Sequence, residues 1–298
     1  MKLHIGRVME YLAKLEAAVL SFRVINQHVD CICGKKLQKI EKGSGKVVYE
    51  KEIFEREGST RILITDQSQI FISDFCTIYV LSHDNYELLG KWQIGEDLSS
   101  DICGMTVDEK TLYCSIRNGT LVTVDRCSYE RKEYLISNSS MWSLKVYDNY
   151  LLCGSVDGNL LLLNRETMTI ERNLNLGKQN IRSLVIDGTI LYAASQDKKI
   201  YKINLLTFEI VDVKRNVHKK MYDCVGLYKD MVVTVSYPCS EVALWNKDTL
   251  IKIREIQVPL QLSGCTWIDG EKLFISSRNI LGIGLIRLNE EEQLSGMG

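Results

Sequence analysis

The chain repeats one pattern about every forty residues. Each copy has an apolar run, a polar turn, a second apolar run, another turn, and an alternating run that ends near Asn or Asp, as in the segments that begin at Ile102, Met141 and Ile181. The alternating runs begin at Leu37, Ile78, Leu121, Leu160, Ile200, Val242 and Leu285, at spacings of 41, 43, 39, 40, 42 and 43 residues. Seven copies therefore fill the chain.

A period of about 40 to 45 residues with four short strands per copy is typical of a β-propeller. Helical repeats of similar length need a 3.6-residue apolar period, whereas runs such as "TIYVLSHD" and "KIYKINLL" are rich in β-formers and turn signals recur every 8 to 12 residues. Pro238 and Pro259 both fall in expected loops. We predict an all-β fold, a seven-bladed β-propeller of four-stranded antiparallel blades.

The two ends of the chain share the last blade in this prediction. The seventh copy supplies "LSGCTWID", "KLFISS" and "LIRLN" but no outer strand, while the N-terminal stretch "GRVMEYLAKLEA" resembles the outer strand and connection that begin at Gly45. Taken alone, that stretch has the residue types of a helix. A ring of blades must close, however, and sharing one blade between the termini removes exposed edges. We therefore expect Gly6 to Leu12 to be the outer strand of blade 7, with a surface helix as the alternative.

The predicted single domain covers residues 1–298. Residues 1–16 supply the outer strand of blade 7 and its connection, blades 1 to 6 cover 17–54, 55–95, 96–137, 138–176, 177–214 and 215–258, blade 7 continues over 259–289, and 290–298 form a tail.

Composition excludes several classes of protein. The formal net charge is -1, which gives no global reason to expect binding to nucleic acid or to a membrane surface. No apolar run is long enough for a signal-peptide core or a membrane span. We expect a cytoplasmic protein with free thiols. Cys31 and Cys33 form a C-x-C pair, which could supply two ligands of a zinc site. Because no second pair of ligands accompanies it, no metal and no cofactor is predicted.

The segment "VALWN", Val242 to Asn246, resembles the end of a WD-repeat blade, with Trp245 where that family places its tryptophan. The segment "GSVDGNLLLLN" from Gly154 is similar to the Gly-Ser-x-Asp-Gly hairpin of the same family. The Gly-His pair that usually opens WD repeats is absent, and His218 is the only histidine near such a position. The sequence therefore does not predict the buried network of Asp, His and Ser or Thr that regular WD blades contain.

The resemblance to WD repeats implies a binding face. It places the residue after the first aliphatic of each inner strand near the mouth of the central channel. Trp, Tyr and Arg are enriched at binding hot spots. We expect the partner-binding residues to be Trp142, Arg182, Tyr222, Met141, Met221 and Ser263. The alternative is that Trp142 and Tyr222 are ordinary core aromatics.

Basic residues gather in the loops of the same expected face. The patch comprises Lys36, Arg117, Lys198, Lys199, Lys219, Lys220 and Arg278. Such a patch suits acidic peptides or phosphate groups. A solvated loop rich in lysine is the alternative for the run "KRNVHKK".

Catalytic clusters are not evident. The four histidines are scattered, no phosphate-binding loop motif occurs, and the recurring Asp66, Asp108, Asp187, Asp230 and Asp269 occupy expected turns between the first and second strands. We therefore predict a non-catalytic scaffold that binds a peptide or protein partner, acting as a monomer or as a subunit. A propeller hydrolase or lyase with its substrate in the channel, and a reader of phosphate or phosphoinositide through the basic loops, are the alternatives.

Overall fold

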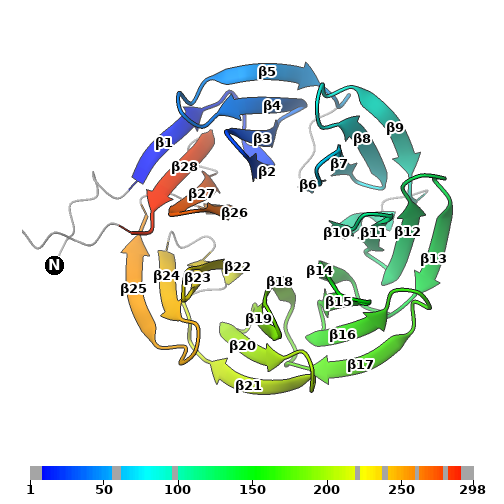
Figure 1. The fold of residues 1–298 in the computed structure, drawn as a ribbon, viewed down its shortest axis with the longest axis vertical. Helices are drawn as coiled ribbons and strands as arrows, with labels where there is room; N and C mark the ends of the chain where they lie inside the picture. Colours follow the sequence, from blue (N-terminus) through cyan, green and yellow to red (C-terminus); the bar gives the residue numbers. More distant parts are fainter. Residues whose placement is uncertain are drawn as a thin grey trace, which may run out of the picture.

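The computed structural model describes residues 9–55, 62–95, 100–218, 222–236, 241–258, 262–277 and 281–289. These residues form seven four-stranded antiparallel sheets arranged as blades around a central axis (Figure 1). In six blades the strands follow one another in chain order, and in the seventh the order is β1-β28-β27-β26. The all-β propeller predicted from the repeat is confirmed.

Each blade has an inner, a second, a third and an outer strand. The inner strands are β2 (Val19–Ile25), β6 (Leu63–Thr65), β10 (Ile102–Val107), β14 (Met141–Tyr147), β18 (Ile181–Asp187), β22 (Tyr222–Tyr228) and β26 (Leu262–Asp269). The second strands are β3 (His28–Cys33), β7 (Gln69–Asp74), β11 (Thr111–Ile116), β15 (Tyr150–Ser155), β19 (Ile190–Ser195), β23 (Met231–Ser236) and β27 (Lys272–Ser277).

The other two positions complete each blade. The third strands are β4 (Lys36–Glu41), β8 (Thr77–Ser82), β12 (Thr120–Asp125), β16 (Asn159–Asn164), β20 (Lys199–Asn204), β24 (Glu241–Asn246) and β28 (Gly282–Arg287). The outer strands are β5 (Val47–Glu52), β9 (Leu88–Gln93), β13 (Arg131–Leu135), β17 (Ile170–Asn175), β21 (Glu209–Lys214), β25 (Lys252–Gln257) and β1 (Met9–Lys14).

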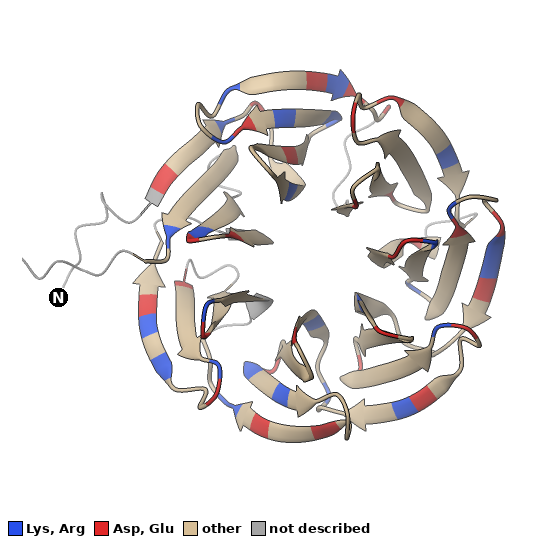
Figure 2. Cartoon of the chain, viewed as in Figure 1, with Lys and Arg blue, Asp and Glu red and all other residues tan. Residues whose placement is uncertain are grey.

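The residue pattern of each strand matches its position in the blade. Second and third strands are almost continuously buried, as in β15 and β16, because neighbouring blades cover both of their faces. Outer strands are largely exposed, as in β17. Figure 2 shows that Lys, Arg, Asp and Glu are frequent on the outer strands and turns. The charged residues therefore face solvent at the rim, while the apolar runs form the interior.

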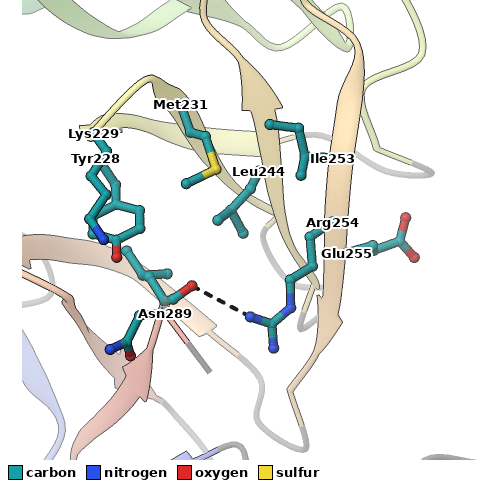
Figure 3. A pocket seen from close by; sticks show the side chains of 9 residues that line it. Tyr228, Lys229, Met231, Leu244, Ile253, Arg254, Glu255 and Asn289 are labelled. Atoms are coloured by element: carbon teal, nitrogen blue, oxygen red, sulfur yellow. Dashed lines mark hydrogen bonds between the residues drawn. The ribbon is translucent and has the colours of Figure 1, made fainter. Parts of the chain in front are cut away.

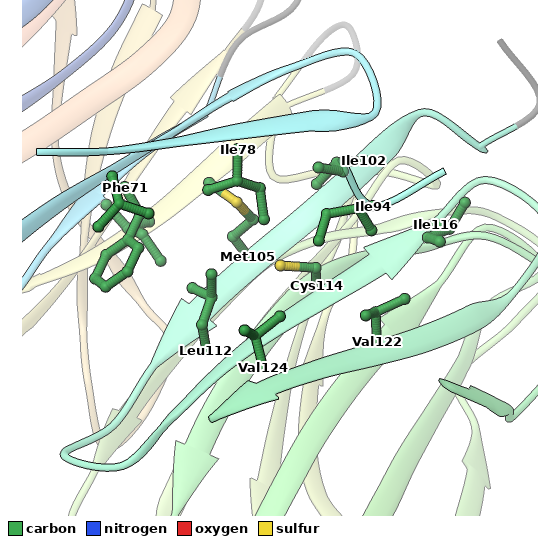
Figure 4. Close-up of a cluster of buried hydrophobic side chains, with 12 residues drawn as sticks. Phe71, Ile78, Ile94, Ile102, Met105, Leu112, Cys114, Ile116, Val122 and Val124 are labelled. Carbon is green, nitrogen blue, oxygen red and sulfur yellow. The ribbon is translucent and has the colours of Figure 1, made fainter. Parts of the chain in front are cut away.

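The core is divided among the spaces between adjacent blades. One cluster joins Phe71 and Ile78 of blade 2 to Leu112 and Cys114 of blade 3, all of which are fully buried (Figure 4). Equivalent clusters occupy the other six spaces between blades. Burying one such side chain contributes about 1.5–3 kcal/mol. Each blade is therefore stabilised mainly by the two blades beside it.

The N-terminal strand completes blade 7, as the sequence predicts. Strand β1 pairs antiparallel with β28 from Met9 opposite Ile286 to Lys14 opposite Gly282. Ala13 is buried in the cluster between blades 7 and 1. The helix alternative is wrong for the described part of this stretch, and residues 6–8 of the predicted strand lie outside the described residues. Packing against β28 and blade 1 outweighs the local preference for helix.

One anchor of the repeat needs correction. In blade 4, Leu160 pairs with Gly154, one residue before the end of β15. The matching pair in blade 7 is Ile283 with Ser276, two residues before the Leu285 that the pattern indicates. A shift of two residues keeps a strand side chain on the same face, so both isoleucine and leucine fit the alternation. With Ile283 as the anchor, the last spacing is 41 residues.

Candidate functional site

The candidate site lies on the upper face, which we define by the connections from each outer strand to the next inner strand, such as 136–140 and 176–180, and by the turns between second and third strands, such as 117–119 and 196–198. Each inner strand begins at this face. The opposite, lower face carries the turns between first and second strands and between third and outer strands.

A bulge recurs at the start of the inner strands. In β10, β14 and β18 the pairing register shifts across one unpaired residue, and the same shift occurs in β2 and β22. The unpaired residues are Leu20, Cys103, Trp142, Arg182 and Asp223. Bulges re-aim a side chain away from the regular alternation. In five of the seven blades, this backbone feature places one unpaired residue near the start of the inner strand.

Two of these residues are in direct contact. The guanidinium carbon of Arg182 lies 4.4 Å from the centre of the Trp142 ring, so the cation stacks on the indole of the preceding blade. Both side chains are partly exposed. The indole N–H of Trp142 is buried and has no hydrogen-bond partner. The sequence predicted both residues as binding residues, and the structure brings them together.

Blade 3 extends this surface with a polar cluster. Arg117, in the turn after β11, forms an ion pair with Asp101 at 3.0 Å, and its carbonyl accepts a hydrogen bond from the Ser140 hydroxyl. Cys103 lies beside them, where burial raises the pKa of its thiol while the charge of Arg117 acts in the opposite direction. The thiol is therefore protonated at neutral pH, which gives no support to a role as a nucleophile.

The register corrects one predicted site residue. Tyr222 pairs with Ser236, as Met141 pairs with Ser155 in blade 4. Tyr222 therefore occupies the first paired position of its strand, and Asp223 occupies the bulge position of Trp142. Tyr222 stands at the position where blades 4 and 5 have the aliphatic residues Met141 and Ile181. The prediction counted from the first aliphatic residue of each inner strand, so in blade 6 it chose a position one residue too early.

The remaining partner-binding predictions have different outcomes. Met141 is fully buried in the cluster between blades 3 and 4, so it does not present a contact surface. Ser263 lies within a wider register shift between Leu262 and Thr266 of β26. Met221 lies outside the described residues.

Three of the four described residues of the predicted basic patch have acidic partners. Lys36 contacts Glu50 at 2.6 Å, Arg117 contacts Asp101, and Lys199 forms an ion pair with Asp197. The hydrogen bond to Glu50 raises the pKa of Lys36. Lys198 adopts a positive φ of 67° in its turn. Lys219, Lys220 and Arg278 lie outside the described residues. Three of the four described residues of the patch therefore form ion pairs, which offset their positive charge.

The basic run also contains a buried histidine, which the alternative of a solvated loop does not explain. His218 is 3% exposed, and its Nε2 lies 2.8 Å from the Thr234 hydroxyl, which also accepts a hydrogen bond from the Trp245 indole N–H at 2.8 Å. The Nδ1 of His218 lies 3.1 Å from a Glu241 carboxylate oxygen. Burial lowers the pKa of His218 to about 4. The neutral ring is hydrogen-bonded to Thr234 through Nε2 and lies against Glu241 through Nδ1, and these contacts anchor the loop to blade 6.

A groove at the lower side of blades 6 and 7 is a second concave feature (Figure 3). It has a volume of about 600 Å³ and is lined by residues that include Tyr228, Met231, Leu244 and Ile253, with Arg254 donating a hydrogen bond to the Leu288 carbonyl at 3.4 Å. Sequence reasoning missed it, because its walls come from all four strands of blade 6 and from the residues that follow β28 in blade 7. The groove is mixed in chemistry and holds no cluster of catalytic groups.

The described ranges contain neither a metal-binding cluster nor a membrane-spanning helix. No group of three or more His, Cys, Asp or Glu side chains there is arranged to hold a metal ion. None of the described segments forms a helix of the length and apolarity needed to cross a bilayer.

Comparison with known proteins identifies the fold and nothing finer. No family model matches the chain. No curated protein matches it either. Among solved structures, the crystal structure of Ika8, a computationally designed protein, is similar with a TM-score of 0.72 and 12% sequence identity, over 93% of this chain and 99% of that one. At that identity the similarity concerns the fold alone.

Proposed function

We propose that this protein is a non-catalytic scaffold that binds a peptide or protein partner on its upper face, at the surface formed by Trp142 and Arg182. The observation that carries the proposal is the stacking of the Arg182 guanidinium on the Trp142 indole at the rim of the central axis. Stacking holds the planar guanidinium in one orientation, so its donors are positioned before a partner arrives.

The chemistry of this pair suits a peptide. Arg182 offers a fork of N–H donors to carbonyl or carboxylate oxygens, while the indole offers an apolar face. Residues of these two types dominate the binding energy of protein interfaces. Blade 3 adds polar groups from Arg117 and Ser140 next to the pair. A partner segment that crosses blades 3 to 5 therefore meets polar and apolar contacts in succession.

We also propose that the blades are of the WD-repeat type. The hydrogen-bonded chain from Trp245 through Thr234 to His218 in blade 6 corresponds to the buried His and Ser or Thr network of regular WD blades, with Glu241 in place of the aspartate. The absence of the Gly-His pair hid this network in the sequence. Its presence in a single blade supports a degenerate member of that family.

A binding role without catalysis is supported by the state of the titratable groups. His218 is buried and bonded within its blade, and the aspartates of the lower-face turns are held by backbone amides and ion pairs. The protonated Cys103 thiol adds no nucleophile at the mouth.

Affinity purification from the native cell followed by mass spectrometry tests the proposal. The wild-type chain is compared with W142A, with R182A and with R172A, which removes an exposed arginine of outer strand β17. We expect a partner that wild type and R172A recover equally and that both W142A and R182A lose. Binding measured with the purified partner should weaken at least tenfold in each site variant.

Thermal unfolding of all variants serves as the control that the two site variants are folded. Equal recovery of every partner by W142A, R182A and wild type would remove the assignment of this surface.

A further inference from the structure

Basic residues are rare on the inner strands. The seven inner strands contain Arg23, Lys145 and Arg182 as their only basic residues. Arg182 is at the upper rim, stacked on Trp142. Lys145 follows Trp142 by three residues on β14, which places it about 10 Å further along the axis at ~3.3 Å per residue.

Lys145 and Arg23 occupy the same level of the ring. Lys145 pairs with Leu152, the third residue of β15, and Arg23 pairs with Asp30, the third residue of β3. The two side chains come from blades 4 and 1, which lie on different sides of the axis (Figure 1).

The Lys145 side chain is exposed on the inner strand of blade 4. Leu144 is buried and Val146 packs against the cluster between blades 3 and 4, whereas Lys145 is exposed. The charged group that acts on Lys145 is Arg23, three blades away. An exposed side chain on an inner strand can interact with the far side of the ring only through the space on the axis.

Lys145 has no counter-ion in the described structure. No acidic side chain among the described residues lies within 4 Å of its ammonium group. Surrounding protein lowers the pKa of this lysine, and the positive charge of Arg23 lowers it further. Holding two like charges in a partly desolvated space costs free energy unless an anion is placed between them.

Arg23 is held in position for such a role. Its guanidinium carbon lies 5.1 Å from the ring centre of Trp267 in the neighbouring blade 7, and it donates a hydrogen bond to the Phe22 carbonyl at 2.9 Å. Planar stacking orients the guanidinium donors, as at many sites that recognise carboxylate and phosphate.

We propose that this protein binds a small oxyanion of phosphate size on its central axis, between Lys145 and Arg23. This site is distinct from the upper-face surface and from the basic loops, because it is built from the inner wall of the ring. It does not depend on the proposed scaffold function.

Thermal unfolding and isothermal titration calorimetry of the purified chain test the proposal. Inorganic phosphate is compared with chloride at matched ionic strength, and succinate is the dicarboxylate probe. We expect phosphate to raise the unfolding temperature of the wild type, and the apparent Kd for phosphate to weaken at least tenfold in K145M. K132M is the matched control, because Lys132 is an exposed lysine of β13.

Two more measurements keep the test decisive. K145M should unfold at a higher temperature than wild type in chloride, because it removes the uncompensated charge, and K145R should retain phosphate binding. A response to succinate that depends on Lys145 supports the same site. The proposal is wrong if neither oxyanion stabilises the wild type, or if K145M responds to phosphate as K132M does.

Discussion

Single buried polar residues show how the interior tolerates charge. Asp30 in β3 is 1% exposed, and one carboxyl oxygen accepts a hydrogen bond from the Tyr86 hydroxyl of blade 2 at 2.9 Å. The other oxygen has no hydrogen-bond partner. Burial raises the pKa of Asp30, although the Tyr86 hydrogen bond acts in the opposite direction. The pair joins two blades, but the ionised carboxylate is under-satisfied.

Replacing Asp30 by Asn should stabilise the protein at neutral pH. Because the folded pKa of Asp30 is raised, its carboxyl group contributes most to stability below its unfolded pKa of about 3.9. This contribution to the free energy of unfolding is lost as the pH rises through the folded pKa. D30N keeps the acceptor for Tyr86 and removes the charge. Urea unfolding at pH 7 should show a gain on the order of 1 kcal/mol, which disappears near pH 4.

Tyr86→Phe is the control for that prediction. It removes the hydrogen bond and leaves the charge, so it should destabilise the fold at pH 7. A D30N variant less stable than wild type at pH 7 would contradict the assigned cost of the Asp30 charge.

At the scale of elements, the lower-face turns connect one blade to the next. The residue that follows the third strand contacts the turn aspartate of the preceding blade in four cases: Lys42 with Asp269, Arg126 with Asp66, Arg165 with Asp108 and Lys247 with Asp187. The sequence predicted these aspartates as turn residues, and the backbone amides of Ser68 and Gln69 do bond to Asp66. It did not reveal the basic partners.

The Arg126 contact is the most buried of the four. Its side chain is 9% exposed, donates to Gln69 at 2.9 Å and lies over the Phe71 ring at 5.4 Å. Burial opposes ionisation of Asp66, but the amide hydrogen bonds and the charge of Arg126 outweigh it and lower the pKa of Asp66. The amide groups of the turn and the charge of Arg126 therefore stabilise the same carboxylate.

We expect R126A to lose about 2 kcal/mol of unfolding free energy at pH 7. Because the folded pKa of Asp66 is lowered, its stabilisation is present above about pH 4 and is lost as the pH falls through the folded pKa. Urea unfolding of wild type and R126A should therefore converge between pH 4 and pH 2. R131A, at an exposed pair on β13, should change stability by less than about 0.5 kcal/mol. A constant difference at every pH would show that Arg126 acts through its packing and its other hydrogen bonds, and not through the charge of Asp66.

At the scale of the whole molecule, the ring depends on one seam. Strand β1 is the part of blade 7 that comes from the other end of the chain, and the Leu15 amide donates to the Leu281 carbonyl beside it at 2.6 Å. The chain passes close to itself at Gly282, where an added Cβ would lie 2.1 Å from the Ala13 carbonyl oxygen. Glycine is required there by the approach of β1.

Gly282→Ala should therefore open the seam. We expect a loss of about 2 kcal/mol or more in unfolding free energy, because the clash falls on backbone that cannot move without breaking the β1–β28 pairing. Gly43→Ala is the matched control, since an added Cβ there meets no atom within 4 Å. Hydrogen exchange should show faster opening of β1 and β28 in G282A. Equal stability of the two variants would contradict a closed seam.

The sequence by itself determined the period, the number of blades, the strand positions and the sharing of blade 7 between the two ends. These features are local, since each apolar run and turn carries its own alternation and turn residues. Leu160 and Ile200 could thus be placed as buried third-strand residues before any contact was known.

Only the tertiary structure decided the contacts between blades. Asp223 rather than Tyr222 occupies the bulge position, because register depends on pairing with β23 and both choices fit the local pattern. Arg126 meets Asp66 and Lys145 faces Arg23 across gaps of 60 and 122 residues in the chain. Closure of the ring brings such residues together, and no local pattern of apolar and polar residues encodes which charges will meet.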